Sequence, residues 1–161
     1  MERFRILVLV LAGLGFLGFG AWFIVDPIGP LAAIGIGVSG DPAATELRAF
    51  YGGVQVAIAL LMLVAATKPA WRDAGLWLVL AVNAGIAVAR LLGVAIDGVW
   101  VPFFTYALIW ELGFSALAAA GLFPGRAAGY VPRPVPGRGA AGRARVAPAG
   151  GQGGRGLRRF P

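Results

Sequence analysis

Four long apolar segments, separated by short links, dominate the pattern of hydrophobic and polar positions along the chain. The first segment, 6–25, has twenty residues without a charge. As a helix it would be roughly 30 Å long, which is the thickness of a hydrocarbon core. The other apolar segments cover 42–67, 74–96 and 101–123. We therefore predict an all-α fold in which residues 1–123 form an integral membrane four-helix bundle.

Residues in the links explain where these helices begin and end. Asp41 suits an N-cap, and Pro42 suits the first helical position because its missing N–H is not needed there. Pro69 ends the second segment, and Gly98 allows a turn between the third and fourth. Each boundary thus has a local cause that is independent of hydropathy.

Basic residues in the links predict the orientation. Arg3 and Arg5 precede the first segment, Lys68 and Arg72 lie between the second and third, and Arg126 follows the fourth. The other two links carry only acidic charges. By the positive-inside rule, both termini are expected in the cytoplasm. The first segment is longer than a signal-peptide core and lacks an A-x-A site, so we interpret it as a retained helix.

Composition agrees with membrane residence and assigns the basic character to the tail. The chain is 59% hydrophobic and only 13% charged, against about 25% charged in soluble domains. The net charge is +7, but eight arginines and no acidic residue follow Phe123. Residues 124–161 are rich in glycine and proline, so we expect a disordered cytoplasmic tail that contacts lipids or has no function. It lacks interleaved aromatics, so no nucleic-acid partner is expected.

The residue types that most enzyme mechanisms need are missing. The sequence has no cysteine and no histidine, which excludes disulfides, Cys/His metal sites and the commonest general base. Serine occurs only at positions 39 and 115, and a Ser-His-Asp triad is excluded. We expect no catalytic residue, no metal and no cofactor, and hence no enzyme.

Polar residues inside the apolar segments are the candidates for function. An ionisable side chain at the centre of a membrane helix costs about 2.5–3.5 kcal/mol, so each should have a partner. Spacings of seven place Asn83 with Arg90, and Arg48 with Gln55, on shared helix faces. An Arg90–Glu111 or Arg90–Glu46 ion pair would then lie in the outer half of the bundle. The predicted polar cluster consists of Glu46, Arg48, Tyr51, Gln55, Asn83, Arg90 and Glu111.

Three interpretations of this cluster stay open. Its members could fix helix register and satisfy one another. They could line a pocket for a small amphiphile, a lipid headgroup or an anion, or Glu111 could relay protons or ions. Glycines at 13, 15, 18, 20, 52 and 53 offer small faces for packing within the bundle, or for a homodimer or a membrane-protein partner.

A family resemblance is carried by the string Glu46-Leu-Arg-Ala-Phe-Tyr-Gly-Gly53, with Arg90-Leu-Leu-Gly93, Asp97-Gly98 and Glu111. The chain resembles a bacterial four-helix membrane family, domain of unknown function 4345, over about residues 4–123. The resemblance implies a multi-pass protein of the inner (plasma) membrane and emphasises Glu46, Arg48, Tyr51, Gly52, Arg90 and Glu111. It implies no activity.

These observations favour a non-enzymatic membrane module that binds a lipid-like small molecule or a membrane partner through the polar cluster. The alternative is an oligomeric small-solute or proton-coupled transporter that uses Glu111. An intramembrane enzyme would have only carboxylate, tyrosine and arginine chemistry to use.

Overall fold

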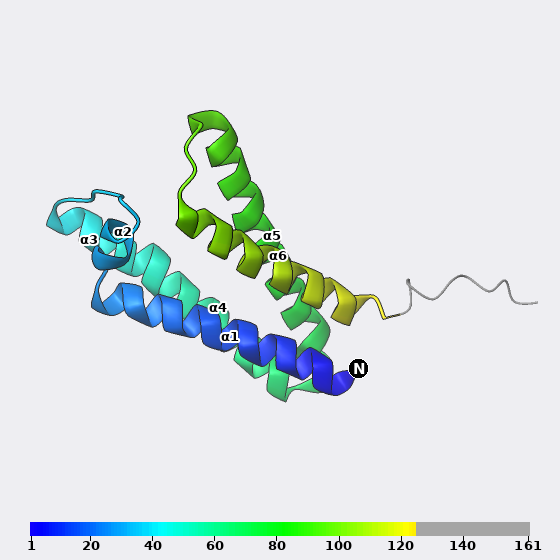
Figure 1. Cartoon of the computed structure of the whole chain (residues 1–161). Helices are drawn as coiled ribbons and strands as arrows, with labels where there is room; N and C mark the ends of the chain where they lie inside the picture. The colour runs from blue at the N-terminus through cyan, green and yellow to red at the C-terminus, as the bar shows by residue number, and fades with distance from the viewer. Residues whose placement is uncertain (125–161) are drawn as a thin grey trace, which may run out of the picture. The chain divides into compact units, whose positions relative to one another are not determined.

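The computed structural model describes residues 1–124, which are helical and contain no strand. The predicted disordered tail, 124–161, lies outside the described residues apart from Pro124. The helices, in chain order, are α1 (Glu2–Val25), α2 (Gly29–Ala32), α3 (Asp41–Leu47), the π-helical η1 (Arg48–Gly53), α4 (Val54–Thr67), the 3-10 helix η2 (Pro69–Trp71), α5 (Arg72–Asp97) and α6 (Pro102–Leu122) (Figure 1).

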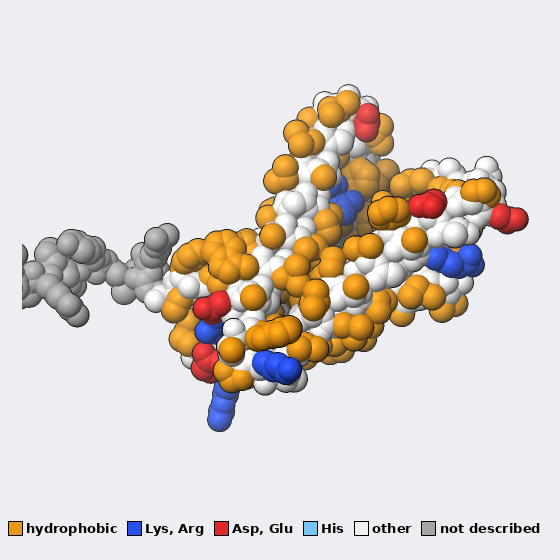
Figure 2. Space-filling model, turned by 180° about the vertical axis from the view of Figure 1, so that it is seen from behind, with side chains coloured by type: hydrophobic (Ala, Val, Ile, Leu, Met, Phe, Trp, Pro, Cys, Tyr) orange, Lys and Arg blue, Asp and Glu red, His pale blue; other side chains and the backbone are white. Residues whose placement is uncertain are grey.

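Four helical stretches are long and apolar enough to cross a membrane, which confirms the predicted fold class. They are α1, the continuous stretch α3–η1–α4, the stretch η2–α5, and α6. Within the most apolar part of each, only 17% to 39% of the residues are buried. Figure 2 shows hydrophobic side chains over most of the visible face, with acidic and basic ones mainly toward the helix ends. Such a surface requires an apolar solvent.

The helices are arranged as two hairpins. In the first, α1 packs beside α4 and η1, and in the second, α5 packs beside α6 (Figure 1). Contacts of α1 with α5 and α6, and of α4 with α5, join the hairpins. The buried core between them is small and aliphatic, with two aromatic rings; it contains Val8, Leu9, Ala12, Phe16, Ala59, Met62, Ala65, Ala66, Leu76, Val79, Phe114 and Ala118.

A network of ion pairs ties the start of α1 to the start of α5. Arg5 pairs with Glu2 at 3.2 Å and with Asp73, and Arg72 pairs with Glu2. Both arginine side chains are mostly buried, at 17% and 14% exposure. A Cβ added at Gly121, near the end of α6, would lie 3.6 Å from Arg5 Cγ. We call this end of the molecule, where α1 and α5 begin and α6 ends, the basic end.

Two of the spans depart from their predicted form: the second from a regular helix over 42–67, and the third in where it begins. Hydrogen bonding shifts to the π-helical pattern over Arg48–Gly53, which overlaps the sequence string that carries the family resemblance. The extra residue of a π-turn changes which side chains face α1, and a period of 3.6 residues cannot reveal it. The third span also begins earlier than the predicted residue 74, because Pro69 starts a 3-10 turn that continues into α5.

Two glycines let the backbones of α1 and η1 approach closely. Gly20 and Gly52 are both buried. A Cβ added at Gly52 would lie 2.7 Å from Ile24 Cγ1, and one added at Gly20 would lie 2.9 Å from the Gly52 oxygen. The predicted glycine faces of α1 and η1 thus pack against each other within the first hairpin, as glycines commonly do between membrane helices.

Replacing Gly52 by alanine should destabilise the protein, since the added methyl group would overlap Ile24. Overpacking of this kind costs about 1–3 kcal/mol, so the midpoint of thermal unfolding in mild detergent should fall. Gly53→Ala is the matched control. It changes the adjacent glycine of η1, where the nearest atom to an added Cβ is 3.8 Å away. Equal midpoints for the two variants would show that the close approach at Gly52 does not matter for stability.

Candidate functional site

An ion pair between α5 and α6 is the most deeply placed charged contact among the described residues. Arg90 Nε donates to both Glu111 carboxylate oxygens at 3.2 and 3.3 Å, and Arg90 Nη2 donates to Glu111 Oε1 at 2.6 Å. The Glu111 side chain is 7% exposed and that of Arg90 is 20% exposed. Charge-assisted bonds of this multiplicity are strong, and they neutralise both groups within the apolar span.

Two aromatic rings flank the Arg90 guanidinium. Its central carbon lies 5.6 Å from the ring centre of Phe103 and 5.4 Å from that of Phe104. Both distances are within the range of cation–π attraction. The link between α5 and α6 is short, because Gly98 ends α5 in the left-handed conformation and Pro102 begins α6. Sequence reasoning did not single out these rings, although the short link was the signal that could have placed them opposite Arg90.

A cavity of about 490 Å³ opens beside this ion pair. Its wall carries a cation, a carboxylate, an aromatic ring and aliphatic groups, from Arg90, Gly93, Val94, Asp97, Val99 and Phe104. We call it the Arg90 cavity. Asp97 is exposed and has no ion-pair partner within residues 1–124. A wall that combines a few charges with apolar surface is typical of small-molecule sites.

The remaining ionisable members of the predicted polar cluster lie on the first hairpin. Arg48 Nε donates to the backbone oxygen of Ile24 at 3.1 Å, which caps the end of α1, and Glu46 is exposed. Tyr51 stacks on Phe23 with ring centres 5.1 Å apart. Within residues 1–124 no hydrogen bond or ion pair joins Glu46 or Arg48 to the Arg90–Glu111 pair. The structure thus brings together Arg90 and Glu111, and it shows no Arg90–Glu46 pair in this part of the chain.

Two amide side chains in the predicted cluster have a buried oxygen without a hydrogen-bond partner in the described part of the chain. Asn83 is 1% exposed; its Nδ2 donates to the Val79 oxygen at 2.8 Å, but its Oδ1 has no partner. Gln55 Oε1 is likewise buried without a hydrogen-bond partner among the described residues. Ser115 donates to the backbone oxygen of Glu111, not to its carboxylate. Unpaired buried acceptors are costly, and neither amide lines the Arg90 cavity.

Removing one partner of the buried ion pair should cost more stability than removing both. Arg90→Leu or Glu111→Leu leaves one uncompensated charge in an apolar span, at about 3–5 kcal/mol, whereas the double variant leaves none. Unfolding free energies of the three variants in detergent, compared as a double-mutant cycle, measure this coupling. Additive losses in the double variant would mean that the two side chains do not depend on each other.

Comparison with known proteins identifies a family and assigns no activity. The family model described as domain of unknown function (DUF4345) matches residues 4–122. That range includes all four membrane-length helices apart from Glu2 and Arg3 of α1, as well as the Arg90–Glu111 pair. No curated protein and no solved structure matches the chain. Because the model covers most of the chain, the protein belongs to the family of domain of unknown function 4345.

Proposed function

We propose that this protein is a non-enzymatic membrane module that binds a lipid-like amphiphile in the Arg90 cavity. The observation that carries the proposal is the wall of that cavity, where Arg90 and Asp97 lie among Val94, Val99 and Phe104. A charged headgroup would contact the two charges, and the adjoining hydrocarbon would contact the apolar part. The cavity lies at the α5–α6 turn, where Asp97 ends α5, and so at a helix end that the headgroup region of a bilayer can reach.

Hydrogen-bonding capacity supports a zwitterionic headgroup. Glu111 accepts from Nε and Nη2 of Arg90, which leaves Nη1 without an acceptor among the described residues. Nη1 can therefore donate to a phosphate-type oxygen. The exposed carboxylate of Asp97 can accept from an ammonium group. Because Glu111 already neutralises Arg90, the cavity wall keeps one net negative charge, which favours a ligand that brings a cation along with its anion.

The orientation predicted from the link charges would place this cavity in the outer leaflet. Arg5, Lys68 and Arg72 belong to the basic end, whereas the α5–α6 turn carries only Asp97. By the positive-inside rule the basic end faces the cytoplasm. The proposed ligand is then an amphiphile that reaches the protein from the outer side of an inner membrane.

The position of Glu111 supports binding of a ligand better than transport of a solute or of protons. Both of its carboxylate oxygens accept hydrogen bonds from Arg90, and the side chain is 7% exposed. A carboxylate that relays protons or ions needs access to solvent on at least one side. The transporter alternative would require Arg90 to release Glu111 in each cycle, which would leave two charges unpaired in the membrane.

Filling the Arg90 cavity should remove bound lipid without loss of fold. Gly93 lines the cavity, and an added Cβ there meets nothing within 4 Å. We expect Gly93→Leu, purified in mild detergent with added phosphatidylethanolamine, to show several-fold fewer lipid adducts by native mass spectrometry. Gly85→Leu is the matched control, because Gly85 lies on the same helix outside the cavity, and an added Cβ there also meets nothing within 4 Å.

A second variant tests the headgroup separately. Asp97→Asn removes the acceptor for an ammonium group at an exposed position, so it should lower adducts of phosphatidylethanolamine more than those of phosphatidylglycerol. The proposal fails if Gly93→Leu and Gly85→Leu bind lipid equally. It also fails if Asp97→Asn leaves the ratio of the two lipids unchanged.

A further inference from the structure

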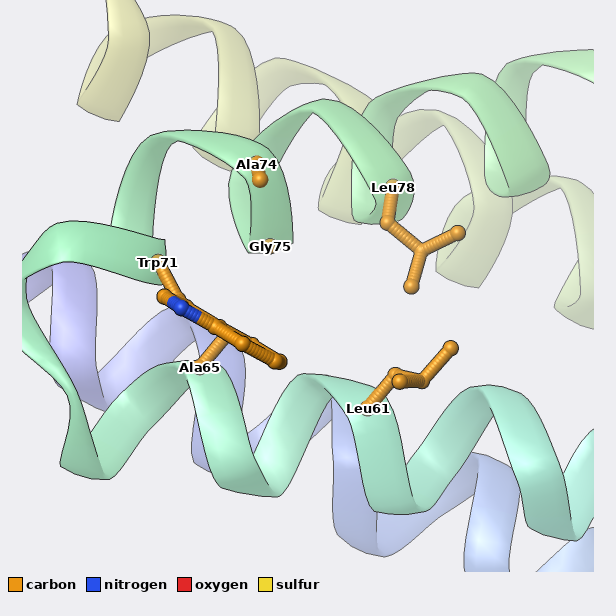
Figure 3. Close-up of a pocket in the computed structure, with 6 residues that line it drawn as sticks. All are labelled: Leu61, Ala65, Trp71, Ala74, Gly75 and Leu78. Carbon is orange, nitrogen blue, oxygen red and sulfur yellow. The ribbon is translucent and has the colours of Figure 1, made fainter.

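A second cavity lies between α4 and α5 near the basic end. Its volume is about 280 Å³, and its lining is apolar: Leu61 and Ala65 from α4, Trp71 from η2, and Ala74, Gly75 and Leu78 from α5 (Figure 3). In Figure 3 the Trp71 ring extends into the gap between the two helices, and Leu61 and Leu78 point toward each other across it. We call it the Trp71 cavity.

The Trp71 cavity is large enough for a hydrocarbon chain and open to one. An apolar cavity of about 150 Å³ binds benzene, so this larger one can hold a longer segment. Leu61 is 52% exposed and Trp71 is 48% exposed, so the cavity opens on the surface that would face lipid. A chain can therefore enter from the side without unpacking the helices.

A free cation lies beside the opening. Lys68 directly follows α4, and its Nζ lies 5.4 Å from the ring centre of Trp71. Lys68 is exposed and has no carboxylate partner within residues 1–124. By contrast, Arg5 and Arg72 of the same end are engaged by Glu2 and Asp73. The charge available to a ligand of this cavity is therefore positive.

We propose that the Trp71 cavity binds an anionic phospholipid, with one acyl chain between α4 and α5 and the phosphate at Lys68. The apolar lining favours an acyl chain, and the ammonium group of Lys68 favours a negatively charged headgroup. With the basic end toward the cytoplasm, the lipid would come from the inner leaflet, where anionic lipids attract basic residues. This site lies at the opposite end of α5 from the Arg90 cavity and does not depend on the function proposed there.

Fluorescence quenching by brominated acyl chains tests the proposal, because Trp71 forms part of the cavity wall. The full-length protein is placed in phosphatidylcholine vesicles that contain a small fraction of brominated phosphatidylglycerol, or the same fraction of brominated phosphatidylcholine. The difference between the wild type and Trp71→Phe isolates the signal of Trp71. We expect phosphatidylglycerol to quench Trp71 several-fold more effectively.

Two pairs of variants distinguish the site from general attraction to an anionic surface. Lys68→Gln should weaken the preference several-fold, because it removes the ammonium group beside the Trp71 ring. Arg3→Gln removes another exposed cation at the same end, one with no ion-pair partner within residues 1–124, and should leave the preference almost unchanged. Ala74→Phe should fill the cavity and abolish the preference, whereas Ala81→Phe, at an exposed position of the same helix, should not.

Three results would overturn the proposal. The first is equal quenching of Trp71 by the two brominated lipids in the wild type. The second is an equal effect of Lys68→Gln and Arg3→Gln, which would assign the preference to surface charge alone. The third is an unchanged preference in Ala74→Phe, which would place the acyl chain outside the cavity.

Discussion

The bond between Arg90 and Glu111 is the contact on which the second hairpin depends. An unpaired charge in an apolar span is unfavourable, at about 2.5–3.5 kcal/mol at the centre of a membrane helix. Each side chain therefore fixes the position of the helix that carries the other. Once the pair forms, the short turn after Gly98 brings Phe103 and Phe104 against the guanidinium. The Arg90 cavity is the space that this arrangement leaves at the helix ends.

Hydropathy was sufficient to predict the fold, because a bilayer constrains helix length and composition so strongly. The four spans followed from apolar runs. The cost of unpaired charge predicted that Arg90 pairs with Glu111 or Glu46, and the structure shows the pair with Glu111. The π-turn at Arg48–Gly53 did not follow, since a local change of hydrogen bonding leaves composition and hydropathy untouched. Nor could the sequence show that Arg48 caps α1 through the backbone oxygen of Ile24. Every residue has a backbone carbonyl, so residue types do not reveal which one accepts the hydrogen bond.

The polar residues described above mostly contact groups within their own hairpin. Arg48 and Tyr51 contact α1 within the first hairpin, and Arg90 contacts α6 within the second. At the basic end the pattern changes, because Arg5 and Arg72 connect α1 with α5. Charged contacts between the two hairpins are thus confined, within the described residues, to one end. Along the rest of their length the hairpins meet through apolar side chains, including Phe16 and Phe114, which impose less directional constraint.

This distribution of charge gives the two ends of α5 different binding chemistry. At its last turns, Glu111 neutralises Arg90 while Asp97 has no ion-pair partner within residues 1–124, so the balance among these groups is negative. At its first turns, Glu2 and Asp73 neutralise Arg5 and Arg72 while Lys68 stays free, so the local balance is positive. Each end also has an apolar or mixed cavity next to the free charge. Lipids that differ in headgroup charge would therefore be sorted to opposite ends of one helix by the charged residue beside each cavity, Lys68 at one end and Asp97 at the other.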